Sequence, residues 1–274
     1  MENNKQTKKV LAIDTSTATL AVAVQNAVGQ VFESNTQAER NHSIHMMKGI
    51  EDTLNQAGLN IKDMDLIAVG VGPGSYTGIR IAVTTAKTLA WSLNIPIVGV
   101  SSLAATALGG LATALSLKQA ECEGISELVD NKSSHWVIPL VDARRGQVYT
   151  GLYQLEQGDF SGKIPLKLES DRITLMSLWC ENLANKWDAL KEEDKPSGIW
   201  FVGETTEMHT KTIMDTLGDK LGDALHIFAY ELSAKWIGQC GEHAFEQGQH
   251  DEAHTLVPNY TQLAEAEAAL LARK

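Results

Sequence analysis

The sequence predicts an α/β protein of two lobes, and three observations carry that prediction. Short apolar runs alternate with helix-length segments from residue 10 onward, which is typical of mixed sheets flanked by helices. A strand, a polar turn and a second strand recur near residues 14 and 142, which indicates a duplicated architecture. The 274 residues suffice for two lobes of about 100 to 150 residues each. We expect one lobe at 8–108 and the other at 109–274, with the C-terminal helix a candidate to pack back on the first lobe.

The first lobe is expected to hold a five-stranded mixed sheet. Its strands are predicted at residues 10–13, 20–24, 30–34, 66–71 and 97–100. Short polar turns join the first three strands, so these should run antiparallel. The fourth is nearly all apolar, as expected of a parallel strand that is buried on both faces.

Two helices complete the first lobe. One begins at Asn41 or Ser43 and ends at Gly58, with apolar residues at helical spacing. The other runs from about Ile79 to Leu93 and is apolar nearly all round, so both of its faces should be buried. One face can cover the sheet, and the other can meet either a partner or the second lobe.

The second lobe repeats parts of this pattern. A polar stretch at 116–134 is expected to form an exposed connection or a partial helix. Strands follow at residues 136–141, 148–153 and 199–202, and a helix at residues 234–247. The order again indicates an α/β lobe.

Composition narrows the functional classes. The formal charge of −11 argues against autonomous binding to nucleic acid, because such proteins use basic groups to neutralise phosphates. The 3 cysteines form no CxxC pair, so a disulfide framework is not expected. The N-terminal apolar run is too short for an export signal, and no run approaches the length of a membrane span. We therefore expect a cytoplasmic protein.

Two turns of the first lobe are candidate ligand sites. Asp14, Thr15 and Ser16 can hold a phosphate, with the carboxylate reaching Mg²⁺ through water, but they are also common turn formers. The glycine-rich turn 72–78 precedes a helix N-terminus, which favours anions. Close packing of the strand and the helix explains the same glycines, and both interpretations stay open.

Other clusters carry weaker signals. His42 and His45 are spaced to share a metal, but a helix surface near a cap is the better explanation. A second group of metal-type side chains lies in a polar, exposed-looking segment and comprises Cys240, His243, His250 and His254. Asp142–Arg145 places one acid beside two bases, more typical of an ion pair that fixes a turn than of catalysis. No G-x-S-x-G or HExxH motif occurs, so we assign no catalytic residue and no metal.

Several strings together resemble the TsaB family, which is also called YeaZ. They are LAIDTS at 11–16, HS at 42–43, GVGPGSYTGIR at 70–80, AKTLA at 86–90 and VGVSSL at 98–103. Later anchors are DARR at 142–145, PNY at 258–260 and EAE at 265–267. The resemblance covers the first 105 residues closely and the remainder at scattered positions.

This resemblance implies a two-lobed actin-like ATPase fold and a part in making threonylcarbamoyladenosine beside the anticodon of tRNA. It implies a scaffold that binds the catalytic TsaD-like paralogue, with a TsaE-like small ATPase joining them and tRNA reached only through the complex. Homodimers through the same first-lobe helices are also implied. The residues expected on these helices at the partner interface are Ile44, Met47, Ile50, Leu54, Ile79, Val83 and Lys87.

Departures from the active paralogues point away from catalysis. TsaD-like proteins carry an H-x-x-x-H metal pair where this chain has Ser102 and Thr106, and hydroxyls are poor replacements for imidazoles. Glu204 follows Gly203 at a turn where a carboxylate would repel phosphate. The alternative is a slow ATPase that binds ATP and Mg²⁺ through Asp14, Thr15 and Ser16. The family's old peptidase label has no support in the motifs. His45, where the family has Glu or Gln, could alter interface detail.

Overall fold

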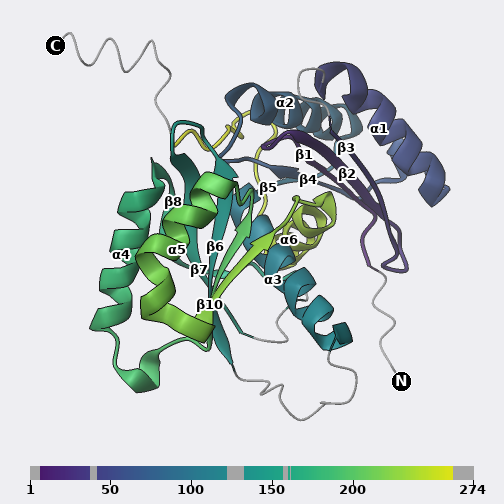
Figure 1. The fold of residues 1–274 in the computed structure, drawn as a ribbon. Helices are drawn as coiled ribbons and strands as arrows, with labels where there is room; N and C mark the ends of the chain where they lie inside the picture. The colour runs from purple at the N-terminus through teal and green to yellow at the C-terminus, as the bar shows by residue number, and fades with distance from the viewer. Residues whose placement is uncertain (1–6, 38–41, 122–132, 157–159, 161, 262–274) are drawn as a thin grey trace, which may run out of the picture.

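The computed structural model describes residues 7–37, 42–121, 133–156, 160 and 162–261. Within these residues the chain forms two five-stranded sheets with helices outside and between them (Figure 1). The expected anchor EAE at 265–267 and Cys122 lie outside the described residues. None of the described helices is both long and apolar enough to cross a bilayer.

The first sheet has the strand order β3-β2-β1-β4-β5. Its strands are β1 (Val10–Asp14), β2 (Thr19–Gln25), β3 (Val31–Gln37), β4 (Leu66–Gly70) and β5 (Ile97–Val100). The strands β1, β2 and β3 pair antiparallel, whereas β4 pairs parallel with both β1 and β5. All five strands occur where the sequence predicted them.

Two helices and a short 3₁₀ turn belong to this sheet. They are α1 (His42–Ala57), η1 (Ile61–Asp63) and α2 (Tyr76–Leu93). The helix α2 begins three residues earlier than expected, because the Ser75 hydroxyl caps it by accepting a hydrogen bond from the Gly78 amide at 3.3 Å. Both helices cover the outer face of the sheet (Figure 1).

The second sheet repeats the order of the first, as β8-β7-β6-β9-β10. Its strands are β6 (Ser134–Asp142), β7 (Gln147–Glu156), β8 (Leu166–Leu175), β9 (Gly198–Gly203) and β10 (Leu225–Ala229). The outer helices are α4 (Met176–Ala189) and α5 (Glu207–Leu221), with 3₁₀ turns η2 (Glu192–Asp194) and η3 (Gly222–Ala224). The repeated topology confirms the duplicated, two-lobed α/β arrangement that the sequence predicted.

The helices α3 (Ser102–Glu121) and α6 (Ala234–Glu246) lie between the sheets. The first packs against β6, β7 and β9, and the second against β1, β2 and β4. The helix α3 was not predicted from the sequence; it begins in the first lobe and packs on the second sheet. The boundary expected between residues 108 and 109 falls inside this helix.

Apolar side chains fill three layers of core. One layer lies beneath α1 and α2, one surrounds α3 and α6 between the sheets, and one lies beneath α4 and α5. The turns β1–β2 and β6–β7 therefore stand at equivalent places in the two lobes, on rigid sheets. This placement positions both turns beside the gap between the lobes.

Candidate functional site

The β1–β2 turn uses its polar groups within the protein. The carboxylate of Asp14 accepts hydrogen bonds from the Ser16 amide and hydroxyl, both at 2.7 Å, and from the Ser102 hydroxyl at 2.6 Å. The Thr15 hydroxyl donates to the Gly78 carbonyl at 2.6 Å. Asp14, Thr15 and Ser16 are all buried. The structure thus brings the three predicted residues together, with their side chains already engaged by neighbours.

The glycine-rich turn packs directly against this β1–β2 turn. A Cβ atom on Gly74 would stand 2.2 Å from the Ser16 carbonyl oxygen, and one on Gly78 would stand 1.9 Å from that of Thr15. The Ser75 amide also donates to the Ser16 carbonyl at 2.7 Å. Of the two interpretations left open above, close packing of backbone on backbone is the one that this geometry supports.

Gly78→Ala is expected to lower the free energy of unfolding by about 2–4 kcal/mol, because its methyl group would overlap a backbone oxygen that cannot move aside. Chemical denaturation measures this loss. Gly49→Ala in α1 is the control, since its Cβ would meet only ordinary contacts at 3.6 and 3.8 Å. A loss below about 1 kcal/mol for Gly78→Ala would show that the turn yields easily.

The positions that correspond to the paralogues' metal pair are also internally bonded. Ser102 begins α3, and its hydroxyl donates to Asp14 while accepting from the Gly72 amide at 3.1 Å. The Thr106 hydroxyl donates to the Ser102 carbonyl at 2.8 Å. Both side chains are buried. Ser102 thus joins α3 to the first lobe, whereas the bond of Thr106 stays within α3.

The β6–β7 turn is held by a partner that the sequence did not reveal. Asp142 bonds through its Oδ1 to the Nε2 of His209 at 2.9 Å, and accepts from the Arg144 amide at 3.2 Å. The expected ion pair within Asp142–Arg145 is therefore replaced by a pair with α5. Arg144 and Arg145 are exposed and adopt left-handed backbone angles, with φ of 65° and 53°. His209 lies in a helix that the sequence analysis did not predict.

A cleft of about 580 Å³ separates the two turns. It is lined by Ser16, Thr17, Ala18, Ser75, Thr77, Gly78, Ile81, Val141, Asp142, Ala143, Arg144, Tyr149 and Glu204. Glu204 accepts the Asp142 amide at 2.7 Å, and burial raises the pKa of its carboxyl group. The predicted magnesium ligand does not face this cleft: Asp14 accepts hydrogen bonds from Ser16 and Ser102, and of the three predicted residues only Ser16 lines the cleft.

A second hollow, of about 420 Å³, lies between α1 and α2. Met47 lines it from α1 and is 56% exposed, and Ile44, three residues earlier on the same helix, is 71% exposed. At its end the guanidinium of Arg80 lies 4.0 Å from the centre of the Tyr76 ring. Its Nε donates to the Tyr260 hydroxyl at 2.8 Å. Methionine, tyrosine and arginine are typical of protein interfaces.

We call Ile44, Met47, Tyr76, Arg80 and Tyr260 the groove face. It includes two of the seven predicted interface residues. The other three members of the face were not predicted as interface residues. Tyr76 and Arg80 lie within the glycine-rich string, but nothing local shows that Tyr260 joins them from the far end of the chain.

Four predicted interface residues are corrected by their burial. Ile50, Leu54, Ile79 and Val83 are only 2%, 5%, 2% and 3% exposed and belong to the core beneath the two helices. On α1, residues 46, 50 and 54 share the inward face, whereas residues 44 and 47 point outward. The apolar residues that the sequence places on α1 therefore belong to two faces of the helix, one in the core and one exposed to solvent.

Lys87, the remaining predicted interface residue, serves the chain's own C-terminal segment. Its Nζ donates to the carbonyls of His254 at 3.2 Å and Leu256 at 2.8 Å. This segment also pairs with β5 through Asp251 and with the core through Leu256. Lys87 thus helps to hold Tyr260 near α2.

The histidine and cysteine candidates are dispersed. His45 is exposed on α1, whereas the side chain of His42 lies outside the described residues. Cys240 is buried in α6, and His254 packs edge-on against Trp91 with ring centres 6.1 Å apart. Among the residues that the structure describes, no group of three or more His, Cys, Asp or Glu side chains could hold a metal ion.

Comparison with known proteins gives a consistent set of relatives. A family model described as "TsaD: tRNA N6-adenosine threonylcarbamoyltransferase" matches residues 26–270. The chain is 38% identical over 261 residues to the "tRNA threonylcarbamoyladenosine biosynthesis protein TsaB" of Bacillus subtilis strain 168, covering 94% of this chain and 96% of that protein. It is 28% identical over 197 residues to the protein of the same name in Escherichia coli K12, covering 70% and 77%.

A solved structure supports the fold. "YeaZ from Pseudomonas aeruginosa" superposes with a TM-score of 0.65 at 23% identity, covering 92% of this chain and 99% of that one. At this identity the likeness speaks for the fold alone. The similarity in sequence and the similarity in fold extend across both lobes.

Proposed function

The chain belongs to the TsaB family, and from this premise we propose that it is the non-catalytic scaffold subunit of the complex that makes threonylcarbamoyladenosine in tRNA. It binds the catalytic TsaD-like paralogue through the groove face. The other subunits contact tRNA, because a chain with a net charge of −11 has too few basic groups in excess to neutralise phosphates. Because the proposed complex modifies tRNA, we also place the protein in the cytoplasm.

The observation that carries this proposal is the exposure of the groove face. An isolated soluble domain gains by burying large apolar side chains, yet Ile44 and Met47 lie open on one helix beside a hollow. Tyr76, Arg80 and Tyr260 form a preorganised aromatic and cationic cluster at the edge of that hollow. Such anchors supply most of the energy in protein interfaces.

The scaffold role is also supported by the occupied polar groups of the β1–β2 turn and the start of α3. Asp14, Ser102 and Thr106 bond one another or their neighbours. None of these three residues lines the cleft between the lobes, so none of them meets a molecule bound there. In the complex, catalysis therefore falls to the paralogue, and this chain supports it.

The same face serves a homodimer of the free chain, so that dimer and complex exclude each other. A TsaE-like small ATPase joins the assembly after the paralogue has bound. Both statements extend the scaffold proposal. Dimer and complex exclude each other because the groove face can be covered by only one partner at a time.

Reconstituted tRNA threonylcarbamoylation tests the proposal. We expect the paralogue with the TsaE-like ATPase to modify tRNA only when this chain is added, with saturation near one chain per paralogue. Asp14→Ala is measured under conditions in which the variant is folded. There the substitution should cause no loss of ATP hydrolysis that is attributable to this chain. ATP hydrolysis by the isolated chain that Asp14→Ala abolishes would contradict the scaffold role and favour the slow ATPase.

A further inference from the structure

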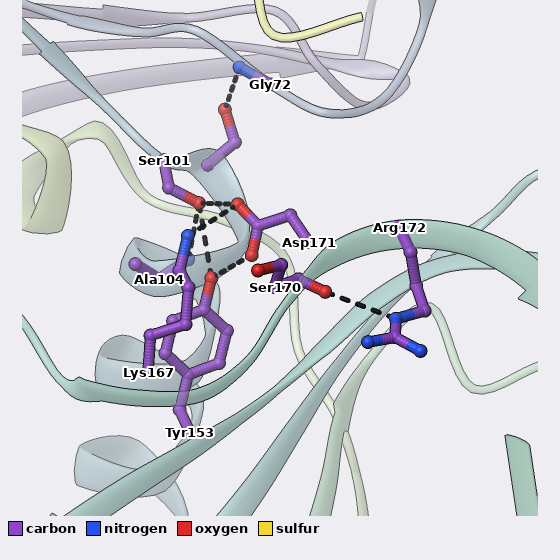
Figure 2. Close-up of polar contacts among 9 residues, drawn as sticks. Gly72, Ser101, Ala104, Tyr153, Lys167, Ser170, Asp171 and Arg172 are labelled. Carbon is purple, nitrogen blue, oxygen red and sulfur yellow. Dashed lines mark hydrogen bonds and ion pairs between the residues drawn. The ribbon is translucent and has the colours of Figure 1, made fainter. Parts of the chain in front are cut away.

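A buried polar cluster joins the two sheets where the chain passes from β5 into α3 (Figure 2). Ser101 directly follows β5, whereas Tyr153 and Asp171 come from β7 and β8 of the other sheet. The Ser101 hydroxyl donates to the Asp171 Oδ2 at 2.8 Å, and the Tyr153 hydroxyl donates to the Asp171 Oδ1. One carboxylate therefore binds both sheets at once.

The surroundings make this contact costly to lose. Tyr153 is fully buried, and the side chain of Asp171 is only 2% exposed. Burial, reinforced by the Asp171 carboxylate, raises the pKa of Tyr153, so its hydroxyl keeps the proton that it donates. The ammonium of Lys167 lies 3.1 Å from Asp171 and balances its charge. A buried carboxylate without its donors is strongly disfavoured.

The cluster is connected to both walls of the cleft. The residue after Ser101 is Ser102, which bonds Asp14 in the β1–β2 turn. The strand β7 carries Tyr153 and also Tyr149, which lines the cleft from the second lobe. A movement that separates Ser101 from Asp171 would therefore carry the two turns apart.

We propose that Asp171 is an inter-lobe latch, which holds the cleft at its present width by accepting the Ser101 hydroxyl from the opposite lobe. Release of the Ser101 hydroxyl from Asp171, and from the Tyr153 hydroxyl 3.3 Å away, lets the lobes open about the crossing from β5 to α3. The inference is independent of the scaffold role and concerns the cleft rather than the groove face.

Distances between spin labels on the two turns test the latch. The labels are attached at Ala18→Cys and Arg145→Cys, both at exposed positions, in a chain that carries Cys122→Ser. Native Cys180 and Cys240 are buried, which raises the pKa of each thiol to about 12 and keeps them unreactive. The unaltered latch should give one narrow distance distribution.

Asp171→Ala and Ser101→Ala should each broaden this distribution and shift it to longer distances. Asp215→Ala is the matched control, because Asp215 also pairs with a lysine four residues earlier but lies on the surface of one lobe. If Asp171→Ala does not fold, Ser101→Ala decides, since it leaves Tyr153, Asp171 and Lys167 in contact. An unchanged distribution in a folded Ser101→Ala chain would overturn the latch.

A double-mutant cycle separates the latch from the helix cap, because the Ser101 hydroxyl also accepts the Ala104 amide at 3.2 Å. We expect Ser101→Ala and Asp171→Ala to be coupled by about fivefold or more in the unfolding equilibrium constant. Independent effects of the two substitutions would contradict a direct contact across the lobes.

Discussion

Met47→Glu is expected to weaken binding to the TsaD-like paralogue by about 100-fold or more without changing the stability of the isolated chain. Met47 is 56% exposed, so the carboxylate of the glutamate that replaces it stays hydrated in the free protein. In the complex the same carboxylate would be buried against an apolar surface with no partner, which costs about 3 kcal/mol or more. Calorimetric titration of the paralogue with the variant measures the affinity.

The matched control is Met214→Glu. Met214 is 52% exposed on α5, at the outer face of the other lobe, and should tolerate the change in both affinity and stability. Equal loss of affinity in the two variants would mean that the groove face is not the binding surface. A fall in melting temperature for Met47→Glu alone would mean that the residue supports the fold.

Val83→Glu is expected to lower the free energy of unfolding by far more than a charge at an exposed position of α2, and to leave the chain markedly less stable. Val83 is 3% exposed beneath α2, and a carboxylate there would lose its hydration without gaining a partner. The cost is about 3–5 kcal/mol, a large part of the roughly 5–15 kcal/mol that stabilises a typical domain. Circular dichroism with denaturant titration measures the loss.

Thr88→Glu provides the comparison on the same helix, because Thr88 is exposed and its replacement remains hydrated. Its stability should stay within about 0.5 kcal/mol of the native chain. A Val83→Glu chain that keeps the stability of the native chain and fails only to bind the paralogue would place Val83 at the interface and not in the core.

Most of the first sheet could be predicted from sequence because its strands are short apolar runs between clear turns. The helix α3 was missed for a physical reason. It is buried between two sheets and apolar nearly all round, so it lacks the alternation of faces that marks a surface helix. The strand β8 was missed for the opposite reason, since it is an edge strand with many exposed polar residues.

In the candidate site, too, features set by neighbouring residues could be predicted, whereas contacts between residues far apart in the sequence could not. Asp14, Thr15 and Ser16 were found as a turn, because turn chemistry is local. Their engagement by Ser102 and Gly78 could not be predicted, because these partners lie far along the chain. The same holds for the contact of Arg80 with Tyr260, and no periodic pattern records such pairs.

Size-exclusion chromatography with light scattering, on the chain alone and mixed with its TsaD-like paralogue, tests the central claim most directly. We expect a stable one-to-one complex that forms at the expense of any homodimer, because both would cover the groove face. Persistence of the homodimer beside unbound paralogue, across a range of salt and with nucleotide present, would contradict the scaffold role.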